Sequence, residues 1–395
     1  NAEHDLKTIQ HQNKLHEIQQ ALLNDELCLY YQPKVNMKTG KIFGVEALIR
    51  WLHPQKGLIP PLEFLPLISG TDLEIQIGEW VINQALNQMS IWREQAIALE
   101  VSINVSSYHL QDTLFIEQLD SALARVPEIN AKHFQLEILE SSALGDIQTI
   151  SRIIKHCRAR LGVKIALDDF GTGYSSLTHL RSLAITAIKI DQSFVRDMLD
   201  DPSDYAIINS VIGLADSFNR EVIAEGVETT EHGLMLLMMG CHQAQGYGIA
   251  RPMPASEIGM WLSQYKPNQQ WLTTAEQHLT AKEIQLSLLT LAIHQWQGYF
   301  EKNILSMPAE IEYWPIMAKN KCQCGTWIKR ARQDAVCSVK WLKEFDDLHN
   351  DMHHIASDLL LKYENDRHEE ARLGLIQIRA SFDSMNQLIS SEMTS

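Results

Sequence analysis

Residues 163–169 read Val-Lys-Ile-Ala-Leu-Asp-Asp, and residues 187–191 read Ala-Ile-Lys-Ile-Asp. Both are short apolar runs that end in acidic residues. Eight such candidate strands occur in the first part of the chain, at residues 27–32, 42–48, 101–105, 134–138, 163–167, 187–190, 221–224 and 242–245. Amphipathic stretches with a helical period, such as residues 203–218, separate most of them. Strands and helices that alternate to this number predict an α/β barrel with eight strands.

The link between the first two candidate strands is the exception to this alternation. Only residues 33–41, with a turn at Gly40, lie between them. A connection this short cannot contain a helical crossover, so the two strands should be antiparallel neighbours. We therefore predict a TIM-like (β/α)8 barrel with one antiparallel strand.

The composition changes near residue 270. Sixteen of the 19 Gly and ten of the 12 Pro precede residue 271. Because Gly and Pro mark turns, the remainder should consist of a few long helices, with helical patterns at 274–302, 334–363 and 369–391. We predict a barrel domain with an N-terminal helix over residues 1–266 and an all-α four-helix bundle over residues 267–395.

Charge and cysteine content limit the partners and the compartment. The chain has 34 Lys and Arg against 49 Asp and Glu, a net charge of −15, which argues against a nucleic-acid polymer as partner. No apolar run approaches the ~20 residues that cross a bilayer. The six Cys do not resemble a disulfide framework, so we expect a cytoplasmic location. Because the chain begins at Asn1 without an initiator Met, we expect it to be a piece of a longer protein.

Polar side chains end the candidate strands of the barrel. They are Gln32, Glu46, Asn104, Glu137, Asp168, Asp169, Lys189, Asp191, Glu225 and Gln245. Each alone is more simply a solvated strand end, but in a barrel all of them converge on one mouth. Carboxylates gathered there repel unless divalent cations hold them, and oxygen donors suit Mg²⁺ or Mn²⁺. Lys189 would be costly to bury without acidic partners. The residues therefore indicate metal-dependent hydrolysis of a phosphoester.

An ordered set of motifs makes this prediction more specific. The motifs are Tyr31-Gln32-Pro33, Glu46-Ala47-Leu48 with Arg50, Asn104-Val105-Ser106, Glu137-Ile138-Leu139-Glu140, the run 168–177, Ile188-Lys189-Ile190-Asp191, Ala224-Glu225-Gly226-Val227-Glu228-Thr229 and Gln245-Gly246-Tyr247. Together they resemble the EAL family of cyclic-di-GMP phosphodiesterases over residues 22–262. The sequence departs from the family at Leu139, where Thr is usual, and at Ser69, where an acidic residue is usual. Neither departure removes a metal ligand.

The resemblance implies a role for each matching residue. It implies that Glu46, Asn104, Glu137 and Asp168 hold one Mg²⁺ or Mn²⁺, that Asp168 and Asp169 hold a second, and that Lys189 and Glu225 act with Glu46 and Asp169 in catalysis. Gln32, Arg50, Asp191 and Gln245 would bind the substrate, and Glu140 and Glu228 would anchor the loop that contains Gly171 and Gly173. The implied reaction hydrolyses cyclic di-GMP to linear 5'-pGpG in a homodimer.

A second candidate metal site lies in the helical region. His349 and His353 are four residues apart and project from one face of a helix. With His294 and Cys322 they would make a tetrahedral zinc site. The segment 322–327 fits the Cys-x-x-Gly-x-Trp signature of the chemoreceptor zinc-binding domain, which residues 279–391 resemble. Cys324 and His354 are adjacent alternatives that fit the signature less well, and Cys337 is more simply a core residue.

Three hypotheses for the whole chain follow. In the first, zinc occupancy shifts the dimer arrangement and, through the loop 169–177, sets the rate of hydrolysis. In the second, the barrel is a catalytically silent cyclic-di-GMP receptor with a zinc-responsive dimerisation domain. In the third, the helical bundle dimerises the chain without a metal. The intact set of barrel carboxylates and Lys189 favours an enzyme over a receptor.

Overall fold

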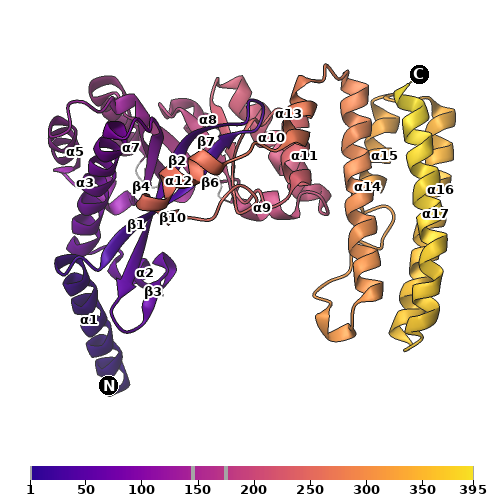
Figure 1. Ribbon diagram of the computed structural model, residues 1–395, viewed down its shortest axis with the longest axis horizontal. Coiled ribbons are helices and arrows are strands. Elements are labelled where there is room, and N and C mark those ends of the chain that lie inside the picture. Colours follow the sequence, from indigo (N-terminus) through magenta and orange to yellow (C-terminus); the bar gives the residue numbers. More distant parts are fainter. Residues whose placement is uncertain (1, 144–146, 173–176, 395) are drawn as a thin grey trace. The chain divides into compact units, whose positions relative to one another are not determined.

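A computed structural model describes residues 2–143, 147–172 and 177–394 (Figure 1). Eight of its strands close into a barrel: β1 (Leu27–Asn36), β2 (Lys41–His53), β4 (Glu100–Asn104), β5 (Phe134–Leu139), β6 (Lys164–Phe170), β7 (Ala187–Ile190), β8 (Glu221–Ala224) and β9 (Gln243–Gln245). The barrel closes because β1 pairs with both β2 and β9. The barrel and its eight strands are as predicted.

Strand direction follows the lengths of the connections. β1 is antiparallel to β2 and to β9, whereas the neighbours from β2 through β9 run parallel. The predicted antiparallel strand is therefore confirmed. Two short strands were not predicted: β3 (Gly57–Ile59) pairs with β2, and β10 (Met253–Pro254) pairs with β1. Both are too short to leave an alternating pattern in the sequence.

Helices cover the barrel and follow most strands. They are α1 (Ala2–Leu23), α2 (Pro61–Ile68), α3 (Asp72–Glu94), α4 (Ser107–Leu110), α5 (Phe115–Ala124), α6 (Glu140–Ala143), α7 (Ile147–His156), α8 (Leu177–Ser182), α9 (Gln192–Asp197), α10 (Pro202–Ser217), α11 (Thr230–Met238) and α12 (Ala255–Gln264). In α3 the buried side chains Ile77, Val81 and Leu86 recur at helical spacing. The parallel strands are buried on both faces, so the consecutive residues 134–138 of β5 are all buried, including Glu137, which faces the interior of the barrel mouth.

Four long helices form the C-terminal bundle: α14 (Ala281–Leu305), α15 (Gln323–Gln333), α16 (Val339–Glu364) and α17 (His368–Met393). Aromatic side chains such as Trp296, Phe345 and Phe382 fill its core. The predicted helical bundle is confirmed, but two details of it were wrong. The helix expected at 274–302 is two helices, α13 (Gln269–Glu276) and α14, because Thr280 and Glu283 form a capping box that starts α14. In addition, the polar segment between the predicted helices 274–302 and 334–363 contains a helix of its own, α15.

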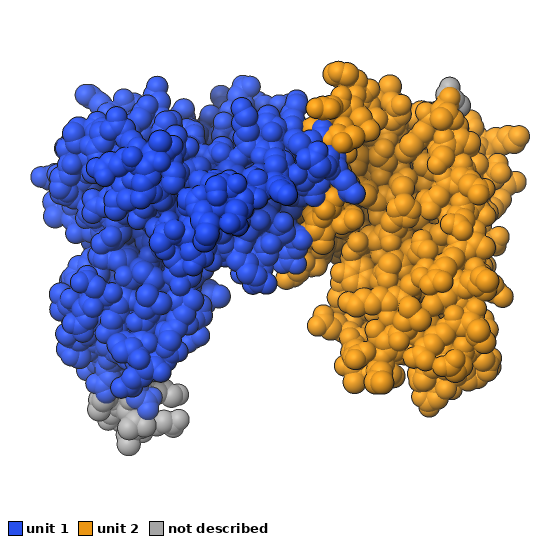
Figure 2. Space-filling model, in the orientation of Figure 1, with its two compact units in different colours: residues 1–192, 211–228, 241–272 blue, residues 193–210, 229–240, 273–395 orange. Residues whose placement is uncertain are grey.

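Contacts between Cα atoms divide the chain into two compact units (Figure 2). Unit 1 comprises residues 1–192, 211–228 and 241–272, and unit 2 comprises residues 193–210, 229–240 and 273–395. Unit 2 thus combines the bundle with α11, most of α9 and the first half of α10. The division predicted from composition, at residues 266 and 267, stays a prediction. Among the described residues, no helix has the length and apolar character needed to span a bilayer.

Candidate active site and metal-binding clusters

The carboxyl ends of the barrel strands bring the predicted polar residues of unit 1 together. Register explains part of this arrangement, because Asn104 of β4 lies opposite Glu137 of β5. Asn104 Nδ2 donates a hydrogen bond of 2.7 Å to Glu46 Oε1 from β2. Glu46, Glu137 and Asp168 are all buried. Residues far apart in the sequence therefore form one acidic cluster.

Lys189 of β7 lies in the middle of this cluster and is fully buried. Its Nζ lies 2.5 Å from Glu137 Oε2, 2.6 Å from Glu225 Oε1, 3.1 Å from Asp168 Oδ1 and 3.4 Å from Glu46 Oε2. Burial alone would lower the pKa of Lys189, but these carboxylates outweigh it and hold the pKa well above its usual value. Lys189 is therefore a permanent ammonium ion in this arrangement.

The carboxylate oxygens form two groups with the spacing of metal ligands. Glu46, Glu137 and Asp168 offer oxygens within 4.8 Å of one another, and so do Asp168, Asp169 and Glu225. Asp168 belongs to both groups. Glu137 Oε1 has no hydrogen-bond partner in the described part of the chain although it is buried. Buried anionic oxygens gathered around a shared carboxylate fit a pair of hard divalent cations.

The pKa values of these carboxyl groups differ because their neighbours differ. Burial and then the charge of Glu137 raise the pKa of Glu46. Burial also raises the pKa of Asp168, and it raises that of Asp169 to about 7. At Glu137, by contrast, Lys189 and Lys34 outweigh burial and lower the pKa to about 2. A cation bound at this cluster would favour the ionised carboxylates and so lower these raised pKa values.

Lys34 is a second buried cation of this site that the sequence pattern did not single out. Lys34 is only 1% exposed; its Nζ lies 3.6 Å from Glu137 Oε1 and donates a 2.8 Å hydrogen bond to Ser102 Oγ. The signal was present, because Lys34 stands between Pro33 and Val35 in an apolar strand, as Lys189 does in β7. We read that strand as ending at residue 32, which left Lys34 outside it.

Gln32 and Gln245, predicted to bind substrate, hold Glu46 in this structure. Gln245 Nε2 donates hydrogen bonds of 2.5 Å to Glu46 Oε2 and 2.9 Å to Gln32 Oε1. Gln32 Nε2 donates in turn to the carbonyl oxygen of Ala250 at 3.0 Å. Both glutamines are buried. Their described partners make them positioning residues for Glu46, and contact with substrate stays a prediction.

The other predicted substrate residues lie at the edge of the cluster. Arg50 of β2 is half-buried, donates from Nη1 to the carbonyl oxygen of Ile49 at 2.8 Å, and lies over the ring of Tyr30 at 5.8 Å. Asp191 follows β7 and lies close enough to Asp169 for the two carboxyl groups to share a hydrogen bond, which helps to raise the pKa of Asp169. Asp191 is therefore a neighbour of the second carboxylate group.

The loop after β6 begins at the cluster. Asp169 has a φ of 54° and Gly171 a φ of 105°, so the backbone turns sharply through left-handed conformations here. Glu140 Oε2 accepts a 2.9 Å hydrogen bond from the backbone N of Gly171, and its role as an anchor of the whole loop stays a prediction. Glu228 follows β8, and its carbonyl oxygen lies 2.5 Å from the position that a Cβ on Gly248 would take. The predicted loop extends to residue 177, but residues 173–176 lie outside the described residues.

Comparison with known proteins bears on this barrel. Residues 15–252 match the EAL domain family. The chain belongs to this family. Over 249 residues, it is 42% identical to the cyclic di-GMP phosphodiesterase PA2567 of Pseudomonas aeruginosa, covering 63% of this chain and 42% of that protein. It is 36% identical over 250 residues to the cyclic di-GMP phosphodiesterase PdeR of Escherichia coli, covering 63% of this chain and 37% of that protein.

A solved structure supports the EAL fold. The PaMucR phosphodiesterase in its c-di-GMP complex superposes with a TM-score of 0.60 at 40% sequence identity, covering 62% of this chain and 99% of that one. The chain spans less than half the length of the two curated relatives. Their names apply to whole proteins, so the matches to them identify the EAL domain of this chain and leave its other parts to be interpreted from their residues.

Outside the EAL barrel, unit 2 contains a third group of potential metal ligands. Cys322, the N-cap residue of α15, lies with Sγ 3.2 Å from Nε2 of His349 on α16, and the rings of His349 and His353 are 4.7 Å apart. All three side chains are buried, and each offers a ligand atom within 4.8 Å of the others. His349 Nδ1 and both ring nitrogens of His353 have no hydrogen-bond partner among the described residues. Donors left unpartnered in a buried site fit a metal ion.

The protonation of this group suits metal binding. Burial lowers the pKa of His349 and of His353 to about 4, so both imidazoles are neutral at pH 7 and can donate a lone pair. Burial raises the pKa of Cys322 to about 11, so without a metal the thiol keeps its proton. A bound cation would displace that proton.

His294, the fourth predicted zinc ligand, does not lie with this group. Its side chain is exposed on α14, and its Nε2 lies 3.1 Å from Asn386 Nδ2 on α17. The reason is helical geometry: Ile293 and Trp296 take the inward face of α14, so His294, about 100° around the helix from Ile293, turns outward. His354 is also exposed, whereas Cys324 and Cys337 are buried in the bundle core. The structure therefore does not bring His294 to this group, and its role as a zinc ligand stays a prediction.

Proposed function

We propose that this chain hydrolyses cyclic di-GMP to linear 5'-pGpG with two divalent cations. The observation that carries the proposal is the pair of carboxylate groups that share Asp168 around the buried ammonium of Lys189. Membership of the EAL family and the names of relatives such as PdeR support the substrate. Opening one of the two phosphodiester bonds of the cyclic ring converts it into the linear dinucleotide.

The residues present fit Mg²⁺ or Mn²⁺. One ion would be held by Glu46, Glu137 and Asp168 with the amide oxygen of Asn104, and the other by Asp168, Asp169 and Glu225. Turning the Asn104 amide toward an ion would require its 2.7 Å hydrogen bond to Glu46 to change. Such a pair of cations activates water and neutralises the attacking and leaving oxygens of a phosphodiester.

The chain's own residues complete the proposed site. Lys189 keeps the carboxylates together, and as a permanent ammonium it can donate a hydrogen bond at the reacting phosphate. Gln245 and Gln32 hold Glu46 in one orientation. Arg50, near the mouth and with no ion pair among the described residues, would bind a phosphate of the dinucleotide through its guanidinium fork.

Metal removal tests the reaction directly. We expect the purified chain to release pGpG from cyclic di-GMP in Mg²⁺ or Mn²⁺, as followed by chromatography, and to lose this turnover in EDTA because the carboxylates alone cannot activate water. Restoring either ion should restore turnover in the wild type and not in Glu46→Gln. A wild type that binds cyclic di-GMP with the ions present and never releases pGpG would instead establish the silent receptor.

We also propose that Cys322, His349 and His353 bind one zinc ion that regulates the barrel. One thiolate and two neutral imidazoles are the donors that zinc prefers, and the three unpartnered ring nitrogens support the site. The resemblance of segment 322–327 to a zinc-binding signature points to the same metal. Zinc occupancy would then set the rate of hydrolysis in a homodimer.

Zinc content separates this three-residue site from the four-residue site of the resemblance. Elemental analysis should find one zinc per chain in the wild type. The zinc affinity of Cys322→Ala should be at least about tenfold lower, because a thiolate ligand is lost. His294→Ala should keep its zinc, as should His354→Ala, the matched control for an exposed histidine next to His353. Loss of zinc in His294→Ala would show that α14 supplies a ligand after all.

Regulation needs a separate readout. We expect the turnover of the wild type to differ between zinc-loaded and zinc-stripped protein, and the turnover of Cys322→Ala to be the same in both. If the wild type binds zinc and its turnover does not change, the zinc has a structural role and does not regulate the barrel.

A further inference from the structure

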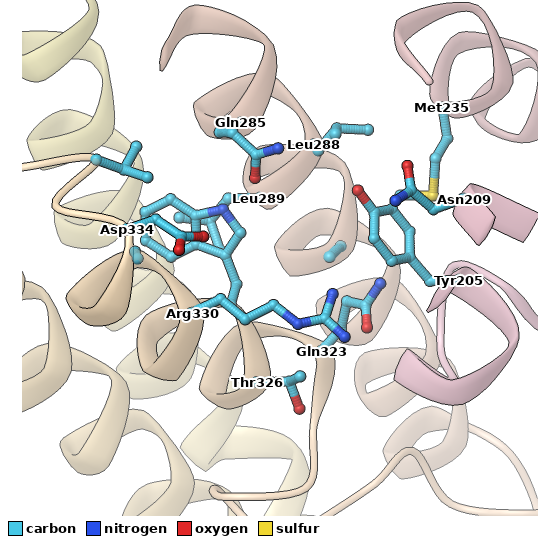
Figure 3. Close-up of a pocket in the computed structure, with 14 residues that line it drawn as sticks. Tyr205, Asn209, Met235, Gln285, Leu288, Leu289, Gln323, Thr326, Arg330 and Asp334 are labelled. Atoms are coloured by element: carbon cyan, nitrogen blue, oxygen red, sulfur yellow. The ribbon is translucent and has the colours of Figure 1, made fainter. Parts of the chain in front are cut away.

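A cavity of about 290 Å³ lies within unit 2, apart from the carboxylate cluster and from the three zinc-ligand candidates (Figure 3). Its walls come from α10, α11, α14 and α15. Figure 3 shows Gln285 pointing into it from α14, Arg330 reaching across it from α15, and Tyr205 facing both from α10. The volume lies at the lower end of the range for small-molecule sites, which suits a single ring system better than a dinucleotide.

The polar groups of this cavity are mostly carboxamides. Gln285, Gln323 and Asn209 each present an amide with a donor and an acceptor side by side, and the hydroxyl groups of Tyr205 and Thr326 add to them. Paired donors and acceptors of this kind match the edge of a heterocyclic base. The lining includes few charges, so the cavity does not resemble a site for a phosphate.

Among the described residues that line the cavity, Arg330 is the only cation and Asp334 is the only anion. The guanidinium of Arg330 has no hydrogen bond or ion pair to any described residue, although Asp334 lies one helical turn away and its backbone N donates to the Arg330 carbonyl oxygen. Its positive charge opposes the effect of burial on the pKa of Tyr205, which places the guanidinium near that phenol. Arg330 is exposed, so its guanidinium lies at the solvent-facing side of the cavity, where it can donate two parallel hydrogen bonds to adjacent acceptors of a ligand.

The apolar walls complete the fit to a flat ring. Leu288, Leu289 and Ala292 of α14 and Trp327 of α15 line the cavity together with Met235 of α11. Leu288, Leu289, Ala292 and Met235 are buried, so their positions are fixed by the packing of unit 2. Flat aromatic ligands gain both contact area and stacking in such surroundings.

We propose that this cavity binds a guanine base. Two acceptors on one edge, the O6 and N7 of guanine, match the fork of Arg330, whereas adenine presents a donor at the corresponding position. The carboxamides of Gln285 and Gln323 can pair with the remaining polar edge of the ring. This second site stands on the cavity alone, while the proposed substrate and its product both carry guanine and are natural sources of the ligand.

Calorimetric titration of the full chain with guanosine tests the proposal. Guanosine should bind at least about fivefold more tightly than adenosine, and Arg330→Gln should weaken guanosine binding by at least about fivefold, the smallest loss expected for one bidentate pair. Lys329→Gln is the matched control, because it removes the same charge from the neighbouring exposed residue and leaves the lining intact. Gln285→Leu should also weaken guanosine binding. Because it changes a different residue of the lining, it keeps the test valid if Arg330→Gln fails to fold.

The same titrations distinguish the possible sources of the guanine ligand, and they include the outcomes that would overturn the proposal. Binding of pGpG that depends on Arg330 would identify the reaction product as a ligand of this cavity, whereas binding of guanosine alone would identify the free nucleoside. Guanosine binding that is equal in wild type and Arg330→Gln, or absent from both, overturns the proposal. So does benzoate binding tighter than guanosine and lost in Arg330→Gln, since that would make the cavity an anion site. None of these outcomes depends on turnover at Asp168.

Discussion

Asp168→Asn should lower the kcat for cyclic di-GMP by at least about a thousandfold, the largest loss expected for any single substitution in this chain. Asp168 is the carboxylate shared by both metal-ligand groups, so its replacement weakens both cations at once. Asparagine has the same shape and keeps one oxygen. Its neutral amide cannot bridge two cations, and the variant should fold normally while binding Mn²⁺ weakly.

A control on a neighbouring strand makes this result specific. Glu221 begins β8 at the opposite end of the barrel from Glu225 and is exposed. Glu221→Gln removes a carboxylate in the same way and should leave kcat within about twofold of the wild type, as surface substitutions away from a site do. Turnover by chromatography and Mn²⁺ affinity by calorimetry should fall together in Asp168→Asn. A variant that lost turnover but kept full Mn²⁺ affinity would mean that Asp168 acts on the substrate and holds no cation.

Lys189→Met should lower the free energy of unfolding of the metal-free protein by about 3–5 kcal/mol, measured in urea and EDTA at pH 7. The ammonium lies within 3.4 Å of four carboxylates whose side chains are at most 16% exposed. Removing it leaves those charges buried without a cation. Methionine fills a similar volume, so a packing defect contributes little.

Two conditions should relieve this loss. Mn²⁺ supplies the missing positive charge, so the deficit should shrink when the ion is added. Falling pH should also relieve it, because Glu46, Asp168 and Glu225 already have raised pKa values in the folded wild type and take up protons readily. A group whose folded pKa is raised favours the folded state more as pH falls.

Lys164 offers the matched control for this substitution. It forms one ion pair with Glu100 at 2.5 Å, and its side chain is 27% exposed. Lys164→Met should cost no more than about 1 kcal/mol, since partly exposed pairs contribute little. Equal losses in the two variants, or a Lys189→Met deficit that ignores Mn²⁺, would contradict the central role of this ammonium ion.

Strand order and the acidic mouth of the barrel could be read from the sequence. The pattern of apolar runs closed by polar residues appears at each of the eight strands, and a parallel barrel has only one place where such ends can meet. Their positions at strand ends therefore predict that Glu46, Glu137 and Asp168 lie together. The capping box of Thr280 and Glu283 is an equally local signal, and it marks the start of α14.

Other features depend on contacts that local pattern does not encode. Lys34 meets Glu137 only because β1 turns back to close the barrel, and Gln245 reaches Glu46 from the last strand. α15 begins at a cysteine, an unusual N-cap, and Gly325 permits an approach to the Lys319 carbonyl that a Cβ would block. Neither signal belongs to the common helix-start patterns.

The sequence by itself determined which residues could act. The carboxylates and the lysine stand at the ends of parallel strands, and the two histidines stand four residues apart on one helix face, with a cysteine elsewhere in the chain. Only the tertiary structure decided which of them meet. His294 has the right chemistry and lies one residue away from the inward face of α14, and a rotation of about 100° per helical residue turns it to solvent. The sequence sets the chemical identity of each side chain, whereas the packing of the helices sets the direction in which that side chain points.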